Sequence, residues 1–427
     1  MTVRLLFLAP FLAACATSAA STQSSTRPSA ATAAADSTVP SYLPDVSPRA
    51  MRLWRQAIVI DSHNDMPSKI TDDGYDPGVR HAPGFEPTEG HTDVPRLVES
   101  GVTAEFMSAW VDAPYALRPP DQSFAREIQL VDTIRAFAAR YPRQLLFATS
   151  AADIRRAKRE GKVAILIGAE GGHAIENSLD RLRELQRRGV RYLTLTWNNG
   201  NSWAGSCCGL NGTRTGGLTP FGRDVIREMN RIGIIVDISH VSDSTFWDAV
   251  ATSTKPVIAS HSSARALNEH PRNLTDDQLR AVARNGGVVN VNFFSLFLDP
   301  AYRQARTEAD ADLRRVRDSI GRSGADSASG YREYTTIAAR RYAGLTQTPL
   351  RVLIDHIDHI ARVAGADHVG LGSDFDGVSA LPAGMDDITR LPRIVQGLLD
   401  RGYSETDISK IIGGNMLRVM DIAIDQR

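Results

Sequence analysis

Side chains that could bind a metal ion follow short apolar runs at several places in the chain. Each run is a candidate strand, and the polar residues just after it carry an imidazole or a carboxylate: His63 and Asp65, Glu170, His240, His261, and Asp374. Alternation along a strand puts His63 and Asp65 on one side, so one ion could contact both. Glu170 precedes two glycines, which leave room for its carboxylate to bridge two ions. Such nitrogen and oxygen donors commonly bind zinc, so the pattern predicts a zinc site.

A scaffold must bring these strand ends together. Apolar segments predict eight strands, at 58–62, 104–110, 163–169, 191–196, 234–239, 256–260, 287–293 and 369–374. Helical periodicity lies between most of them, at 126–140, 178–188, 219–232, 275–284 and 350–364. This alternation predicts an α/β fold, a (β/α)8 barrel of the TIM type, whose strands present catalytic groups at their carboxyl ends. A doubly wound open sheet is the alternative.

One connection is too long for a simple loop. Residues 299–344 separate the last two predicted strands and are rich in Arg, Asp and Ala. We expect a helical insertion before the last strand, with its charges on a solvated face. On a barrel it would leave the carboxyl-end face and form a lid or a side wall of the site.

Composition limits the kinds of partner. The chain has 427 residues, of which 42% are hydrophobic, and 49 basic residues balance 49 acidic ones. A protein of this length can bury one large core or two modest ones. Because no excess of basic residues is present, we expect no nucleic-acid partner.

The first residues have the features of a secretory signal. Arg4 precedes an apolar run, Leu5–Ala14, that is too short to span a bilayer. Leu12-Ala13-Ala14-Cys15 then resembles a bacterial lipobox, which predicts a lipid on Cys15 and anchoring to a membrane. Ala16 after the cysteine is typical of lipoproteins sent to the outer membrane. The expected location is the bacterial cell envelope, facing the periplasm; a cleaved, soluble secretory protein is the alternative.

Three regions are therefore expected. Residues 1–14 are a lipoprotein signal peptide, and residues 15–46 are an Ala/Ser/Thr/Pro tether. The tether has too little apolar surface to offset the entropy of ordering. Residues 47–427, with no second linker of this kind, form one catalytic domain.

Several motifs, taken in order, resemble the membrane dipeptidase (renal dipeptidase) family of zinc peptidases from about residue 54 onward. They are His63-x-Asp65, Glu170-Gly171-Gly172-His173, Ile238-Ser239-His240-Val241-Ser242, Ser260-His261-Ser262-Ser263-Ala264, Arg272-Asn273 and Gly372-Ser373-Asp374-Phe375-Asp376-Gly377. The resemblance implies a (β/α)8 barrel with two zinc ions per chain. One would bind His63, Asp65 and Glu170, and the other Glu170, His240 and His261.

The resemblance also implies roles for two further residues. Asp374 would handle the proton, and Arg272 would bind the terminal carboxylate of the substrate. Two metal ions about 3.5–4 Å apart lower the pKa of a shared water from 15.7 to roughly 7, which supplies a hydroxide that attacks the peptide carbonyl. The planar fork of arginine matches a carboxylate, which would select very short peptides with a free carboxyl end.

The chain departs from the best-known members of this family at one position. Where they carry a histidine thought to polarise the scissile carbonyl, this sequence has Trp197, followed by Asn198 and Asn199. Losing one such donor typically costs about 10²–10³ in rate, so a substitute is needed. We predict that the indole N–H of Trp197 or the amide of Asn198 or Asn199 takes the role. The alternative is that Trp197 only walls the pocket.

Cys207 and Cys208 are adjacent in a glycine-rich stretch. If Cys15 is lipidated, they are the remaining thiols in an oxidising compartment, and three states are open to them: a bond with each other, a bond to a partner chain, or free thiols. Consecutive trans residues lie about 3.80 Å apart, closer than the Cα atoms of an ordinary disulfide, so a bond within the pair would be strained. The dimers formed by the family make a homodimer and an intersubunit bond conceivable.

The sequence thus predicts a zinc-dependent dipeptidase on a lipid-anchored barrel. A related metal-dependent amide or lactam hydrolase is the alternative among enzymes, because fold and ligands do not fix the leaving group. A binding lipoprotein that has lost turnover is the alternative outside enzymes. The presence of Trp197 in place of the family's histidine supports this alternative.

Overall fold

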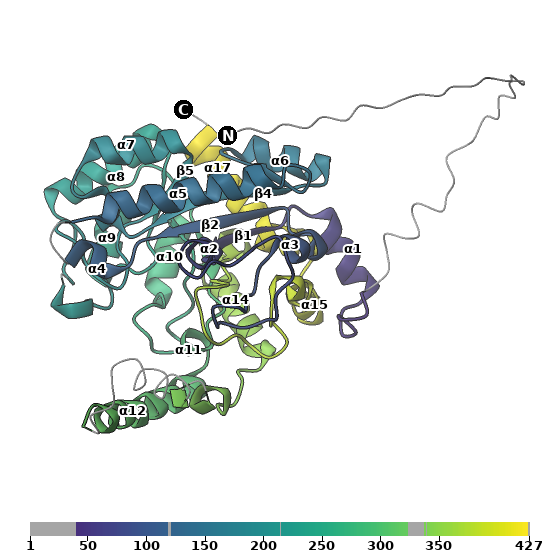
Figure 1. Cartoon of the computed structure of the whole chain (residues 1–427). Coiled ribbons are helices and arrows are strands. Elements are labelled where there is room, and N and C mark those ends of the chain that lie inside the picture. The colour runs from purple at the N-terminus through teal and green to yellow at the C-terminus, as the bar shows by residue number, and fades with distance from the viewer. Residues whose placement is uncertain (1–39, 118–120, 214, 323–336, 339, 426–427) are drawn as a thin grey trace, which may run out of the picture. The chain divides into compact units, whose positions relative to one another are not determined.

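A computed structural model describes residues 40–117, 121–213, 215–322, 337–338 and 340–425 (Figure 1). The predicted signal peptide, Cys15 and most of the predicted tether lie outside these residues. The end of the predicted tether does not: Leu43 and Val46 are buried in the hydrophobic core. Their apolar side chains anchor this segment, so the packed part of the chain begins before residue 47.

Parallel strands form the centre of the fold. They are β1 (Ile60–Asn64), β2 (Ala104–Trp110), β3 (Leu145–Phe147), β4 (Val163–Glu170), β5 (Val190–Thr194), β6 (Ile235–Asp237), β7 (Ile258–Ala259), β8 (Val288–Val291) and β9 (Val369–Leu371). β1 pairs with both β2 and β9, and β2 pairs with β4, which closes a ring of eight strands. The closed ring confirms the predicted (β/α)8 barrel and excludes the open sheet.

The short strand β3 lies outside this ring and was not predicted. It pairs with the beginning of β4, and β5 pairs with the later part of the same strand. Three residues are too few to show a strand pattern, so its neighbour β4 rather than its own sequence defines it.

Helices surround the ring of strands in Figure 1. They are α1 (Pro48–Gln56), α2 (Met66–Asp72), α3 (Val94–Ser100), α4 (Ala113–Leu117), α5 (Ser123–Arg140), α6 (Ala151–Glu160), α7 (Leu179–Arg188), α8 (Pro220–Ile232), α9 (Asp243–Thr252), α10 (Asp276–Arg284), α11 (Ser295–Leu298), α12 (Pro300–Arg322), α14 (Leu350–Ala364), α15 (Pro392–Asp400), α16 (Glu405–Ser409) and α17 (Asn415–Met420). The five predicted helices are α5, α7, α8, α10 and α14. Side-chain caps at Thr219 and Thr275 fix the starts of α8 and α10.

Two apolar layers leave the carboxyl ends of the strands free for a site. The larger layer lies between strands and helices. The smaller one contains residues from the beginnings of the strands, such as Ile60, Ala104 and Ile235, together with Met416 and Met420 of α17. This inner layer fills the amino end of the barrel, so polar residues gather at the opposite end.

The predicted insertion before the last strand is helical where the structure describes it. α12 extends from one side of the barrel and is joined to it through α11 (Figure 1). The rest of the insertion lies partly outside the described residues. No helix in the described part of the chain is long and apolar enough to cross a membrane.

Candidate metal centre

The carboxyl ends of four strands bring the predicted metal-binding residues together. His63 lies at the end of β1 and Asp65 just after it, Glu170 ends β4, and His240 and His261 follow β6 and β7. All five side chains are buried, with Asp65 the most exposed at 8%. The structure therefore places the five residues in one buried cluster, as the sequence predicted.

Glu170 lies at the centre of this cluster. Its Oε1 atom is 2.9 Å from Nε2 of His240 and 3.5 Å from Nε2 of His261. Its other oxygen, Oε2, is 3.4 Å from Nε2 of His63, which is also 3.4 Å from Oδ2 of Asp65. Each carboxylate oxygen of Glu170 thus faces a different part of the ligand set, which is the arrangement of a bridging ligand.

Each of the three imidazoles has its Nδ1 atom bound to an acceptor outside the cluster. Nδ1 of His240 donates to Oδ1 of Asn198 at 3.1 Å. Nδ1 of His261 lies 2.7 Å from the hydroxyl of Ser260, which itself donates to Asp237 and so accepts from the ring.

Tyr192 does the same for His63. Its hydroxyl donates to the carbonyl of Ser62 at 3.1 Å and lies 2.8 Å from Nδ1 of His63, so it accepts the ring hydrogen. In all three rings the Nε2 lone pair therefore points toward Glu170. Nε2 of His63 and Oδ1 of Asp65 are buried without a hydrogen-bond partner among the described residues. Convergent acceptors without hydrogens between them are what a divalent cation needs, so this donor set fits zinc.

The electrostatics of the cluster favour a cation. Burial lowers the pKa of His240 to about 4 and that of His261 well below its usual value, so both rings stay neutral, the form that binds metal. Burial would raise the pKa of Glu170, but the neighbouring histidines outweigh it and hold the pKa well below its ordinary value. Burial also disfavours charge on His63, yet Tyr192, Glu170 and Asp65 raise its pKa well above the ordinary value. The site thus stabilises a positive charge at Nε2 of His63, either a proton or the metal cation that would take its place.

Asp374 lies beside the same cluster. Its carboxylate, with the ligand atoms of His63 and Asp65, forms a set within 4.8 Å of one another, and a second set contains His63, Glu170 and His261. Burial raises the pKa of Asp374 to about 7, and Nδ2 of Asn292 donates to its Oδ2 atom at 2.7 Å.

Gly377 permits this approach. A Cβ atom at Gly377 would collide with both Asp65 and Asp374, so only glycine lets the two carboxylates lie so close. A carboxyl group with a pKa near neutrality is suited to accept and return a proton.

Arg272 contacts the backbone of His261. Its guanidinium is 3% exposed and makes only long hydrogen bonds, to the carbonyl of His261 at 3.2 Å and the hydroxyl of Ser262 at 3.4 Å. Its Nε atom has no partner, and no carboxylate among the described residues forms an ion pair with it. A buried charge without a counterion is costly, so this position is prepared to bind an anion.

The three residues after β5 occupy different places. The ring of Trp197 packs edge-on against Trp110, with centroids 5.1 Å apart, and lies 6.5 Å from the ring of His240. Asn198 binds His240, as described above. Nδ2 of Asn199 lies 3.3 Å from Nδ1 of His173, so Asn199 supports a neighbouring loop rather than the metal cluster.

Sequence reasoning missed the residues that hold the ligands in place. Asp237, at the end of β6, accepts hydrogen bonds from the backbone of Ser239 and Ser260 and from the hydroxyls of Ser260 and Thr194. It therefore joins the loops that carry His240 and His261. The signal that could have revealed Asp237 is a carboxylate ending an otherwise apolar strand.

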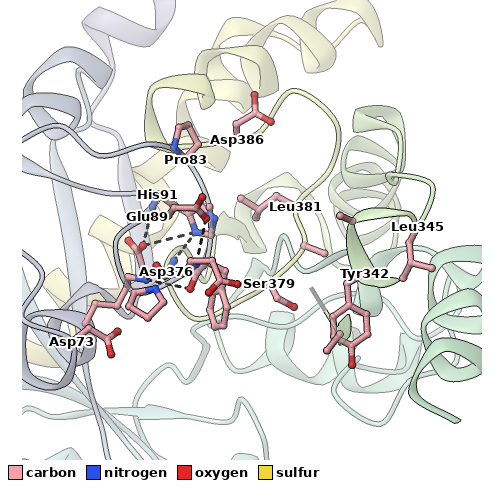
Figure 2. A pocket seen from close by; sticks show the side chains of 18 of the residues that line it. Asp73, Pro83, Glu89, His91, Tyr342, Leu345, Asp376, Ser379, Leu381 and Asp386 are labelled. Atoms are coloured by element: carbon pink, nitrogen blue, oxygen red, sulfur yellow. Dashed lines mark hydrogen bonds and ion pairs between the residues drawn. The ribbon is translucent and has the colours of Figure 1, made fainter. Parts of the chain in front are cut away.

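A cavity of about 970 Å³ lies beside the loop after β9 (Figure 2). Its walls come from α2, the loop 83–91, α12, residues 342–347 and the loop after β9. Figure 2 shows Asp376 and His91 on one side of this space and Tyr342 on the other. Its lining includes Trp110, which packs on Trp197, and Asp376, two residues after Asp374, but none of the five residues of the metal cluster. The insertion thus forms one wall of this cavity.

Comparison with known proteins adds to this geometry. The model of the membrane dipeptidase family, peptidase family M19, matches residues 47–426. The solved structure of the probable dipeptidase PvdM from Pseudomonas aeruginosa is 25% identical, with 89% of this chain and 98% of that chain covered and a TM-score of 0.75. A metallopeptidase from Rhodobacter sphaeroides, solved with a phosphinate mimic of the dipeptide L-Ala-D-Ala, is also 25% identical, with 86% and 99% covered and a TM-score of 0.66.

Proposed function

Because this chain belongs to the membrane dipeptidase family and is a peptide hydrolase, we propose that it cleaves dipeptides at a centre of two zinc ions bridged by Glu170. The observation that carries the proposal is the convergence of three Nε2 lone pairs on the two oxygens of Glu170. His63, Asp65 and Glu170 would hold one ion, and Glu170, His240 and His261 the other. When bound, such a pair lowers the pKa of a shared water to about 7 and polarises a carbonyl.

Asp374 is proposed to move the proton. Its carboxylate is buried next to Asp65, and its pKa of about 7 lets it accept a proton from the attacking water at neutral pH. It then donates this proton to the nitrogen of the leaving amine as the peptide C–N bond breaks. Asn292 holds the carboxylate in place through its hydrogen bond to Oδ2.

Arg272 is proposed to bind the terminal carboxylate of the dipeptide. The buried guanidinium has donors without good partners, and an incoming carboxylate would satisfy them and neutralise the charge. Because Arg272 hydrogen-bonds the backbone of His261, the anchored end of the substrate would lie a short distance from the metal centre. This distance would restrict substrates to very short peptides.

The donor that stabilises the oxyanion is proposed to come from Trp197 or Asn198. Asn198 already uses its side-chain oxygen to hold His240, which leaves its amide hydrogens to face a substrate. Asn199 binds His173, so we assign it a supporting role. Replacing Trp197 by Phe and Asn198 by Ala separately tests the assignment, because unchanged turnover in both would remove it.

Metal analysis followed by a substrate panel tests the function. The protein is assayed with and without added zinc against L,L and L,D dipeptides, N-acyl amino acids and a β-lactam. We expect two zinc ions per chain and zinc-dependent cleavage of dipeptides. Cleavage of only the acyl amino acids or the lactam would favour the alternative hydrolase, and a metal-loaded protein that cleaves none of these compounds would favour a binding lipoprotein.

We further propose that Cys15 carries a lipid that holds the enzyme to the outer membrane, facing the periplasm. The lipobox-like segment Leu12-Ala13-Ala14-Cys15 supports this. Fractionation of cells that produce the full chain or its Cys15→Ser variant tests the proposal, since only the unsubstituted chain should label with palmitate and sediment with membranes. Sedimentation of detergent-solubilised protein would test the proposed homodimer.

A further inference from the structure

Cys207 and Cys208 lie in the segment after β5 that hydrogen-bonds the backbone of His240. Their Sγ atoms are 2.7 Å apart, and both are free thiols. Cys208 is exposed and Cys207 is partly buried, so a small oxidant can reach the pair from solvent. We propose that Cys207 and Cys208 form a reversible disulfide with each other, and that this modification loosens the metal ligand His240.

The first link to His240 is through the backbone. The amide of Cys207 donates to the carbonyl of His240 at 2.8 Å, and the hydroxyl of Thr196 donates to the same carbonyl at 3.0 Å. His240 has a φ of 65°, a left-handed conformation that residues with a Cβ atom rarely adopt. The hydrogen bond from Cys207 is therefore one of the contacts that hold His240 in its unusual conformation.

A second link runs through Asn198. The hydroxyl of Ser206 donates to the carbonyls of Trp197 and Asn198, and the amide of Leu210 donates to Asn198 as well. Asn198 in turn accepts the Nδ1 hydrogen of His240. The segment that contains both cysteines thus supports the backbone of His240 directly and its ring through Asn198.

The chemistry is a thiol–disulfide exchange with an external disulfide. The thiolate of Cys208 attacks one sulfur of the external disulfide, forms a mixed disulfide and releases the first thiol. The sulfur of Cys207 then attacks Sγ of Cys208, loses its proton and releases the second thiol. The protein loses two hydrogens, and the external disulfide is reduced to two thiols. A hydrogen bond from Cys207 and the charge of Arg272 lower the pKa of Cys208 to about 7, which supplies its thiolate.

The same bond should be easy to reduce. Consecutive trans residues place their Cα atoms about 3.80 Å apart, whereas disulfides prefer about 4.4–6.8 Å. Closing the ring must therefore rotate the backbone that joins the two cysteines. The joining peptide carries the N–H of Cys208, which donates to the hydroxyl of Ser206 at 3.1 Å. Its rotation therefore disturbs the hydroxyl that holds the carbonyls of Trp197 and Asn198 and, through Asn198, the ring of His240. The strain of the closed ring favours reduction when thiols return.

The experiment measures the disulfide and metal affinity rather than turnover, so its outcome does not depend on the proposed substrate. A Cys15→Ser chain, in which the pair supplies the only thiols, is equilibrated in glutathione buffers of graded oxidation. Intact mass and alkylation report the disulfide, and competition with a chromogenic chelator reports zinc affinity. We expect a loss of two hydrogens without a covalent dimer, and zinc affinity about tenfold or more weaker, restored by reductant.

Cys208→Ser is the matched control. It removes one sulfur at an exposed position and keeps the amide of Cys207 that binds His240. Its zinc affinity should equal that of the reduced parent chain and should not change in oxidising buffer. Two alkylatable thiols after oxidation, a covalent dimer, or an internal disulfide that leaves zinc affinity unchanged would each overturn the proposal.

Discussion

Nε2 of His240 lies 2.9 Å from Nε2 of His261, and neither atom carries a hydrogen that could bond the other. Both rings give their Nδ1 hydrogens to acceptors outside the cluster, Asn198 and Ser260. Two lone pairs at this distance repel each other unless a cation lies between them and Glu170. The pair of rings is therefore held for an ion, and their own packing does not explain the arrangement.

Glu170→Gln should abolish the binding of both ions, because a neutral amide cannot bridge two cations. Zinc at about 100 times its dissociation constant should stabilise the unsubstituted protein by about 2.7 kcal/mol for each bound ion and leave the stability of the variant unchanged. Thermal unfolding with and without zinc, together with metal analysis, measures this.

Glu127→Gln is the control for that variant. Glu127 is fully buried on α5, and burial raises its pKa well above the ordinary value, which favours the neutral form that glutamine mimics. The Glu127→Gln protein should bind zinc as the parent does. Two retained ions in Glu170→Gln would contradict the bridging role.

Arg272→Gln should slow the cleavage of only those substrates that have a free carboxyl end. A hydrogen bond to a charged group contributes about 1.5–3 kcal/mol, so kcat/KM for dipeptides should fall by roughly 10- to 150-fold. Dipeptide amides, which lack the carboxylate, should react alike with both proteins. Arg265→Gln removes a nearby arginine that is paired with Asp243, and its kinetics should match the parent. An equal loss for acids and amides would assign Arg272 a structural role.

Strand ends made the clustering of the proposed ligands predictable from sequence. His63, Glu170 and His261 each follow an apolar run, and a parallel barrel gathers such ends on one face. The strands themselves are shorter than predicted where they carry the site: β6 stops at Asp237 and β9 at Leu371. The chain leaves the sheet at these points. His240 and Asp374 then adopt a left-handed backbone conformation, which aims their side chains inward.

The supporting contacts were not predictable in the same way. Tyr192 reaches His63 across the barrel, and Asn198 reaches His240 from a neighbouring loop. These pairs are distant in sequence and depend on the closure of the ring, and no local periodicity reports them. The contacts of Trp197 also join residues that are distant in sequence, so the sequence alone left its role open.

Asn198→Ala should weaken zinc binding by about 10- to 100-fold, because the ring of His240 loses the acceptor that fixes its tautomer. Asn199→Ala is the matched variant on the adjacent residue. It should bind zinc normally but lose about 1–3 kcal/mol of unfolding free energy, because Nδ1 of His173 is left buried without a donor. Chelator competition and urea unfolding distinguish the two effects, and equal zinc affinities in both variants would contradict the assignment of Asn198.

Asp374→Asn should lower kcat by about 10²–10⁴ while two zinc ions remain bound, because the amide cannot transfer a proton. Metal content decides between this role and that of a ligand, since Asp374 also lies near His63 and Asp65. Loss of an ion in the variant would show that Asp374 binds metal.

His356 should make the stability of the fold depend on pH. Its ring is fully buried on α14, where Nδ1 accepts from the amide of Ala264 and Nε2 donates to the carbonyl of Leu298. These bonds need the neutral ring, and burial lowers the pKa of His356 to about 4. Between about pH 6.5 and 4 the unfolded chain takes up a proton here that the folded protein does not, so stability falls as the pH falls.

His356→Gln isolates this contribution, because other titrating groups are common to both proteins. At pH 7 the variant should be less stable, since glutamine cannot reproduce both hydrogen bonds. Its deficit should shrink by roughly 2.4 kcal/mol on acidification to pH 4.5, because about 1.36 kcal/mol is lost per pH unit below pH 6.5 and only the parent loses this contribution. Urea unfolding of both proteins at the two pH values measures the difference. Parallel pH curves would mean that His356 takes up its proton in the folded protein as readily as in the unfolded chain.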